Sequence, residues 1–119
     1  MSVQSAHNSP VIPASGQGLR IGVFDSGVGG LSVLKAIRQQ LPLADLIYVA
    51  DSANAPYGER DDAFISDRCH AISKFLNQQH VDGIVVACNT ATAIAVQGLR
   101  AALPDMPIIG VEPGIKPGI

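Results

Sequence analysis

The sequence predicts an α/β fold, a three-layer domain in which helices cover both faces of a four-stranded parallel sheet. Short apolar runs of strand length recur along the chain, and segments with helical spacing of apolar residues separate them. Strands that alternate with helices form parallel sheets. We expect the strand order 2-1-3-4, which makes the domain flavodoxin-like.

Each predicted element has its own sequence signal. The strands are continuous apolar runs, typical of strands buried within a sheet, over residues 19–25, 46–51, 82–87 and 107–111. The helices repeat apolar residues at intervals of three and four, over residues 31–41, 62–79 and 90–103. Asp61 or Asp62 caps the second helix. The apolar face of that helix is predicted to hold Phe64, Ile65, Ile72, Phe75 and Leu76.

Composition narrows the function classes. The net charge of −2 does not indicate the excess of basic residues that is typical of proteins that bind nucleic acid. No apolar run approaches the roughly 18 residues that a membrane helix needs. Two cysteines without a secretory signal indicate a reducing, cytoplasmic setting. Residues 1–18 lack apolar periodicity and are predicted to be a disordered leader. Residues 19–119 then form one α/β domain, which we expect to be truncated at its C-terminal end because a further helix should follow the fourth strand.

Chemistry-bearing residues follow all four strands. Asp25, Asp51 and Cys88 end or follow the first three, and Glu112 follows the fourth. The carboxyl edge of an open parallel sheet is where ligands bind, so these residues predict a site there. Cys88 also precedes a helix, with Asn89 and Thr90 as candidate N-caps, and a helix N-terminus favours thiolate. The alternative is that Cys88 is a small buried hydrophobic residue.

The glycine-rich stretch at 27–30 invites a nucleotide-binding interpretation, but its details argue against one. Ser32 stands where a dinucleotide fingerprint needs its third glycine, and no lysine follows as a P-loop requires. Backbone amides at a helix start remain, which suit a small anion such as a carboxylate. No metal site is predicted, since Cys88 has no partner at ligand spacing. Cys69 lies on the apolar stripe of the second helix and is predicted to pack in the core.

Three motifs together resemble glutamate racemases. VFDSGVGGLSV at 23–33, APYG at 55–58 and VACNTA at 86–91 occur in the order and spacing of that family, and GVEP at 110–113 fits as well. The resemblance implies a cofactor-independent racemase that interconverts L- and D-glutamate for peptidoglycan synthesis, with a homodimer possible for the complete protein. It also implies that Cys88 is one of two catalytic bases and that Asp25 lies near the thiol. The substrate contacts it implies are Asp25, Ser26, Pro56, Tyr57, Gly58, Asn89 and Thr90.

The sequence departs from the family at one point. Racemisation needs an acid–base group on each face of Cα, and the family's second cysteine belongs to a Cys-Thr-His motif that this chain does not contain. Three alternatives therefore stay open. The first is a non-catalytic truncated domain that binds a small carboxylate. The second is a racemase of another amino acid, and the third is a nucleotide-binding flavodoxin-like domain.

Overall fold

The computed structural model describes residues 15–27, 29–54 and 57–111. Its sheet contains β1 (Arg20–Asp25), β2 (Asp45–Ala50), β3 (Gly83–Val86) and β4 (Ile108–Gly110). The strands are all parallel, and their order is β2-β1-β3-β4. Phe24 of β1 lies opposite Val49 on one side and Val86 on the other. The predicted fold class and strand order are therefore confirmed.

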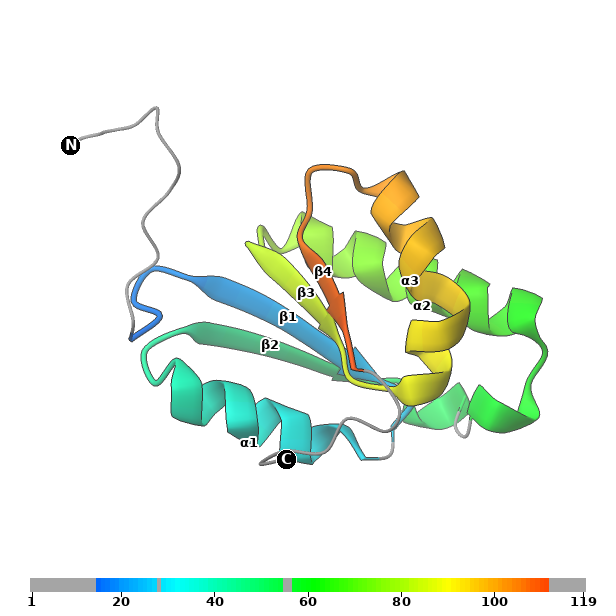
Figure 1. The fold of residues 1–119 in the computed structure, drawn as a ribbon, viewed down its shortest axis with the longest axis horizontal. Helices are drawn as coiled ribbons and strands as arrows, with labels where there is room; N and C mark the ends of the chain where they lie inside the picture. The colour runs from blue at the N-terminus through cyan, green and yellow to red at the C-terminus, as the bar shows by residue number, and fades with distance from the viewer. Residues whose placement is uncertain (1–14, 28, 55–56, 112–119) are drawn as a thin grey trace.

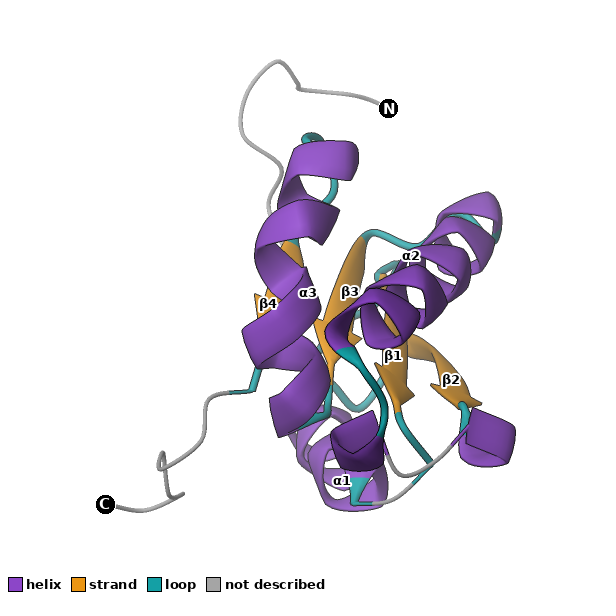
Figure 2. Cartoon of the chain, turned by 90° about the vertical axis from the view of Figure 1, so that its right-hand side faces the viewer, coloured by secondary structure: helices purple, strands orange, loops and turns teal. Residues whose placement is uncertain are grey.

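Helices cover the two faces unequally. The helix α1 (Gly30–Gln40) lies on one face, whereas α2 (Asp62–Gln78) and α3 (Asn89–Ala102) lie side by side on the other (Figures 1 and 2). This division follows from right-handed crossovers, because the chain moves one way from β1 to β2 and the other way afterwards. Two short 3₁₀ turns, η1 (Ser52–Asn54) and η2 (Tyr57–Glu59), connect β2 to α2.

The main core lies between the sheet and the α2–α3 pair. Gly22 of β1 faces Leu76, and a Cβ at position 22 would lie only 2.9 Å from a Leu76 methyl carbon, so the missing side chain lets α2 approach the sheet. The largest side chains buried in this layer are Tyr57, Phe24, Ile65, Leu76, Ile84 and Leu99. Asp61 caps α2 as predicted, because its carboxylate accepts the Phe64 N–H.

The other face of the sheet is less covered than the sequence indicates. The prediction that the second strand is buried is wrong: β2 is an edge strand whose central residues are only partly buried. Leu31 of α1 is 58% exposed, and Ile109 of β4 is 61% exposed. Phe75, expected on the buried face of α2, is 46% exposed because it lies at the margin of that face. Apolar periodicity predicts which side of a helix faces the sheet, but not how wide the buried part of that side is.

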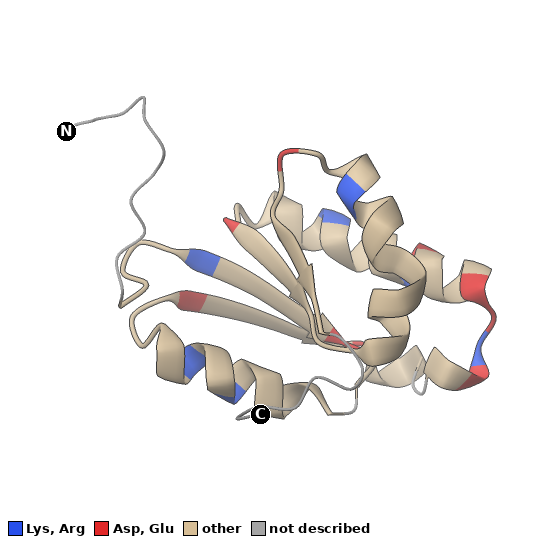
Figure 3. Cartoon of the chain, in the orientation of Figure 1, with Lys and Arg blue, Asp and Glu red and all other residues tan. Residues whose placement is uncertain are grey.

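Charged residues are few, and several meet at the amino end of the sheet (Figure 3). Arg20 at the start of β1 lies 3.6 Å from the carboxylate of Asp45, and its N–H donates to Asp82. Nearby, the N–H of Leu43 donates to the carbonyl of Ser15, so residues 15–18 of the expected leader join this end of the domain. In the described part of the chain, no helix has the length and apolar character needed to cross a membrane.

Candidate functional site

The loops that follow β1, β2 and β3 meet at the carboxyl edge of the sheet. The N–H of Asp51 donates to the Asp25 carbonyl over 3.0 Å, and the N–H of Ala87 donates to the Phe24 carbonyl over 2.8 Å. Gly27 has φ +103°, and a Cβ there would lie 2.6 Å from Cα of Ser52. Only glycine allows this approach, which brings the first two loops into contact. The structure thus gathers the strand-end residues as the sequence predicts.

Asp25 is fully buried and held from two sides. Its Oδ1 accepts the Gly27 N–H and its Oδ2 accepts the Tyr48 hydroxyl, each over 2.7 Å. A Cβ at Gly30 would lie 1.7 Å from Oδ2, so the first residue of α1 leaves room for the carboxylate. Burial, and then this hydrogen bond, raise the pKa of Tyr48 to about 12. One oxygen of Asp25 therefore bonds to the glycine loop and the other to β2, and these two bonds define the orientation of the carboxylate.

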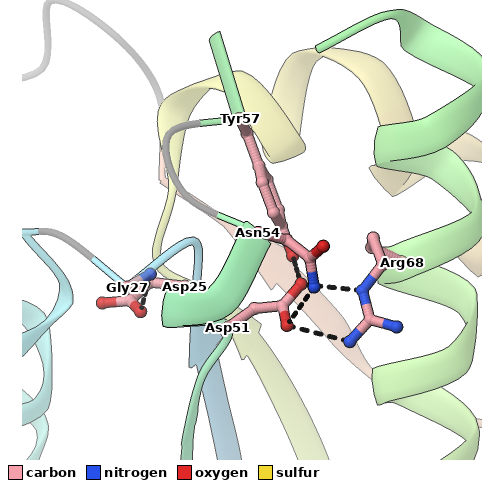
Figure 4. Close-up of polar contacts among 6 residues, drawn as sticks. All are labelled: Asp25, Gly27, Asp51, Asn54, Tyr57 and Arg68. Atoms are coloured by element: carbon pink, nitrogen blue, oxygen red, sulfur yellow. Dashed lines mark hydrogen bonds and ion pairs between the residues drawn. The ribbon is translucent and has the colours of Figure 1, made fainter. Parts of the chain in front are cut away.

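Asp51 is the centre of a second polar cluster (Figure 4). The guanidinium of Arg68 donates from Nε and Nη2 to the two carboxylate oxygens, each over 2.8 Å. The Asn54 amide and the Tyr57 hydroxyl donate to the same carboxylate, over 3.1 and 2.5 Å. The Arg68 hydrogen bonds, with those of Tyr57 and Asn54, lower the pKa of Asp51 to about 2 against the opposing effect of burial. Both oxygens of the Asp51 carboxylate are therefore engaged in hydrogen bonds within the fold.

Tyr57 belongs to this cluster rather than to the surface. Its side chain is 1% exposed and packs in the main core, and burial and the Asp51 hydrogen bond raise its pKa. Gly58, the next residue, is exposed. The sequence-based assignment of both residues as substrate contacts stays a prediction, and in this arrangement Tyr57 would make its contact through the backbone.

Cys88 lies between the tip of β3 and the start of α3. It is the N-cap of α3, and its Sγ accepts the Ala91 N–H over 3.5 Å. The prediction that Asn89 or Thr90 provides the cap is wrong, because Asn89 is already the first helical residue. The Cys88 thiol is half-buried, whereas Cys69 is fully buried. Burial, with the neighbouring Cys88 as a smaller cause, raises the pKa of Cys69 to about 12. The core assignment of Cys69 is confirmed.

The remaining predicted site residues lie around the same edge. Ser26 is buried next to Asp25, Thr90 is half-buried and Asn89 is exposed at the start of α3. Pro56 and Glu112 lie outside the described residues. Asp25 and Cys88 come from neighbouring strands, but the Asp25 carboxylate bonds to Tyr48 and Gly27.

A hollow of about 490 Å³ opens beside the glycine loop. It lies next to Tyr48 and Ala50 of β2, on the opposite side of β1 from the strand that carries Cys88. The hollow and the Cys88 thiol therefore lie at different parts of the carboxyl edge of the sheet. Its lining residues are Gly27, Gly29, Leu31, Ser32, Tyr48 and Ala50.

Sequence reasoning missed Tyr48, Asn54 and Arg68. Each acts on a strand-end aspartate that the sequence did identify, and each lies in a different element. One signal was available for Arg68: it is a cation placed directly before Cys69, at the margin of an apolar helical stripe. Across the described ranges, no three His, Cys, Asp or Glu side chains gather as metal ligands would.

Comparisons with known proteins find related sequences and structures. The family model described as Asp/Glu/Hydantoin racemase matches residues 21–114. The glutamate racemase of Stutzerimonas stutzeri (strain A1501) is 55% identical over 97 residues, which are 82% of this chain and 37% of that protein. The glutamate racemase of Pseudomonas aeruginosa (strain PAO1) is 53% identical over the same shares of both chains. This chain therefore spans little more than a third of the length of these relatives.

Solved structures give the same result. Escherichia coli glutamate racemase, in complex with L-glutamate and the activator UDP-MurNAc-ala, matches with a TM-score of 0.77 and 45% identity, over 83% of this chain and 37% of that one. Glutamate racemase from Aquifex pyrophilus matches with a TM-score of 0.74 and 46% identity, over 77% and 36% of the two chains.

Proposed function

The chain belongs to the Asp/Glu/hydantoin racemase family, and we propose that it provides one of the two acid–base groups of a cofactor-independent glutamate racemase. The observation that carries this proposal is the place of Cys88, which caps α3 at the edge where the buried Asp25 turn also lies. The identities of 53–55% to glutamate racemases support glutamate as the substrate.

The proposed reaction is a proton transfer at Cα. The Cys88 thiolate takes the α-proton, the C–H electron pair moves toward the substrate carboxylate, and a second group returns a proton to the opposite face. The backbone N–H that Sγ accepts from Ala91, at a helix N-terminus, supports negative charge on the sulfur. The bonds made or broken are C–H, the S–H of Cys88, and the bond between the second group and the proton that it returns.

The second acid–base group is the open part of this mechanism. Cys69 is unsuited to it, because its thiol is buried in the core and its pKa is raised to about 12. We expect the group to be the cysteine of the Cys-Thr-His motif that the family resemblance implies and that these 119 residues do not contain. The 119-residue chain alone should therefore not interconvert the enantiomers, and robust conversion in both directions would contradict this assignment of Cys69.

The substrate contacts are proposed by the same reasoning. The hydroxyls of Ser26 and Thr90, the Asn89 amide and the backbone amides of the glycine loop are donors that suit the two carboxylates of glutamate. Pro56, Tyr57 and Gly58 complete the set that the motifs indicate. Asp25 is proposed to orient groups next to the thiol, through a carboxylate that Tyr48 and Gly27 hold in place.

The cellular setting is proposed from the family resemblance. The complete protein would act in the cytoplasm as a homodimer and supply D-glutamate for peptidoglycan synthesis. The support for this setting is the match of all three motifs to the glutamate branch of the family.

A chimera tests the proposal directly. Residues 19–111 would replace the corresponding segment of the Pseudomonas aeruginosa glutamate racemase, and circular dichroism would follow conversion of D- and L-glutamate. We expect an active chimera, its loss of activity on Cys88→Ser, and retained activity in the control Cys69→Ala. A folded chimera that is inactive, or one that tolerates Cys88→Ser, would contradict the proposed role.

A further inference from the structure

The Asp51 carboxylate joins the two 3₁₀ turns that lie between β2 and α2. Asn54 of η1 and Tyr57 of η2 both donate their side-chain hydrogens to it. Each turn is also closed by a backbone hydrogen bond, from the Asn54 N–H to the Asp51 carbonyl and from the Arg60 N–H to the Tyr57 carbonyl. One carboxylate therefore fixes the relative positions of both 3₁₀ turns.

Arg68 makes this arrangement possible. The Asp51 side chain is only 8% exposed, and a carboxylate removed from water is stable only when it is paired and hydrogen-bonded. Arg68 reaches across from α2 and binds both oxygens at once, each over 2.8 Å. A planar guanidinium matches a carboxylate in this way, whereas a lysine ammonium acts as a point charge.

The pinned loop packs against the helix that carries Cys88. η2 contacts α3, and the Tyr57 ring lies in the same core cluster as Ala91 in the first turn of that helix. A displacement of the loop would therefore move Tyr57 and Gly58 relative to the thiol. The cluster of Arg68, Asp51 and Tyr57 is thus a connection between α2 and the proposed substrate edge.

We propose that Arg68 is a positioning residue that holds the turns η1 and η2, through Asp51, in the arrangement that contacts substrate. The substrate part of this inference rests on the proposed function. Both hydrogen bonds that the Arg68 guanidinium donates are to Asp51, so its effect on substrate is indirect. Loss of the guanidinium should release the loop while leaving the sheet intact.

Amide hydrogen exchange on the 119-residue chain tests the clamp. The probes are the N–H groups of Asn54 and Arg60 inside the loop, with the Ala87 N–H in the sheet as reference. We expect Arg68→Met to speed loop exchange about tenfold or more relative to the reference, as loss of a charge-assisted pair implies. Arg68→Lys should give an intermediate effect. Lys74→Met, an exposed change on the same helix, is the matched control and should have none.

Two further variants keep the test decisive if Arg68→Met unfolds. Tyr57→Phe removes only the hydroxyl donor and should speed exchange at Arg60 more than at Ala87. In the double variant Asp51→Asn with Arg68→Met, no unpaired buried charge remains, so the reference amide should recover while the loop stays released. Equal exchange in the loop of Arg68→Lys, Tyr57→Phe and wild type, or uniform acceleration at all three amides, would overturn the clamp.

A second measurement links the clamp to substrate. The rate at which iodoacetamide alkylates Cys88 is measured at increasing concentrations of L-glutamate, in wild type and in Arg68→Lys. We expect protection in both, with half-protection at about tenfold higher glutamate in Arg68→Lys. Unchanged half-protection would overturn the positioning role. Absence of protection in wild type would count against the proposed function, whereas the exchange results decide the clamp separately.

Discussion

Tyr48 donates its phenolic hydrogen to Oδ2 of Asp25 over 2.7 Å, so a residue of the edge strand holds a buried carboxylate at the end of the neighbouring strand. Tyr48 lies opposite Val23, two residues before Asp25, and its side chain spans that diagonal. Tyr57 makes the corresponding bond to Asp51. The two pairs are separate, which provides a matched comparison.

Tyr48→Phe should destabilise the domain by about 1–2 kcal/mol, because a fully buried carboxylate oxygen loses a hydrogen-bond donor while the ring is retained. Urea unfolding measures the change. A double-mutant cycle with Asp25→Asn should show a coupling energy of about 1 kcal/mol. The control cycle of Tyr57→Phe with Asp25→Asn should be additive, and equal coupling in both cycles would disprove a specific Tyr48–Asp25 interaction.

Gly30→Ala should destabilise the domain, although alanine in a helix is ordinarily more stable than glycine by about 1 kcal/mol. The added Cβ would lie 1.7 Å from Oδ2 of Asp25, so the carboxylate must move away from Tyr48 or Gly27. Gly98→Ala in α3 is the matched control, because its Cβ would meet only His70 at an ordinary 3.5 Å. We expect opposite signs in thermal unfolding, and a stabilising Gly30→Ala would contradict the packing described.

Cys88 should react with iodoacetamide at neutral pH much faster than Cys69. Cys88 is half-buried at a helix N-terminus, whereas Cys69 is fully buried and burial raises its pKa to about 12. Peptide mapping after timed alkylation measures both rates. Cys88→Ser should abolish the fast phase and Cys69→Ala should retain it, and a dominant label on Cys69 would refute the assignment.

Acid should remove the contribution of the Asp51 pair. The folded-state pKa of Asp51 is lowered from 3.8 to about 2, so the stabilisation is complete above about pH 4 and is lost as the pH falls toward 2. The shift corresponds to about 2 kcal/mol for this largely buried carboxylate. Urea unfolding between pH 5 and pH 2 should therefore show a steeper loss in wild type than in Asp51→Asn. Parallel profiles would mean that the pair does not stabilise the fold.

Much of the architecture could be predicted because it depends on local patterns. Apolar runs and helical spacing identified four strands and three helices, and short connections with right-handed crossovers then allow few sheet orders. The same logic places Asp25, Asp51 and Cys88 at one edge, since parallel strands all end on the same side. The N-cap of α3 was misassigned by one or two residues, because Cys, Asn and Thr in succession can each accept the capping N–H.

Only the tertiary structure decided which side chains serve these residues. Tyr48 lies in a predicted strand and Arg68 in a predicted helix, and the sequence assigned neither a role, yet each bonds to a buried aspartate from another element. Pairings of this kind depend on the register between strands and on how closely α2 packs, and neither is encoded in a local sequence pattern. By itself, the sequence determined the order of the sheet and the place of Asp25, Asp51 and Cys88 at one edge of it. The burial of Tyr57, and the hydrogen bonds of Tyr48 to Asp25 and of Arg68 to Asp51, over 2.7–2.8 Å, arise from long-range packing, because they depend on segments that lie far apart in the sequence.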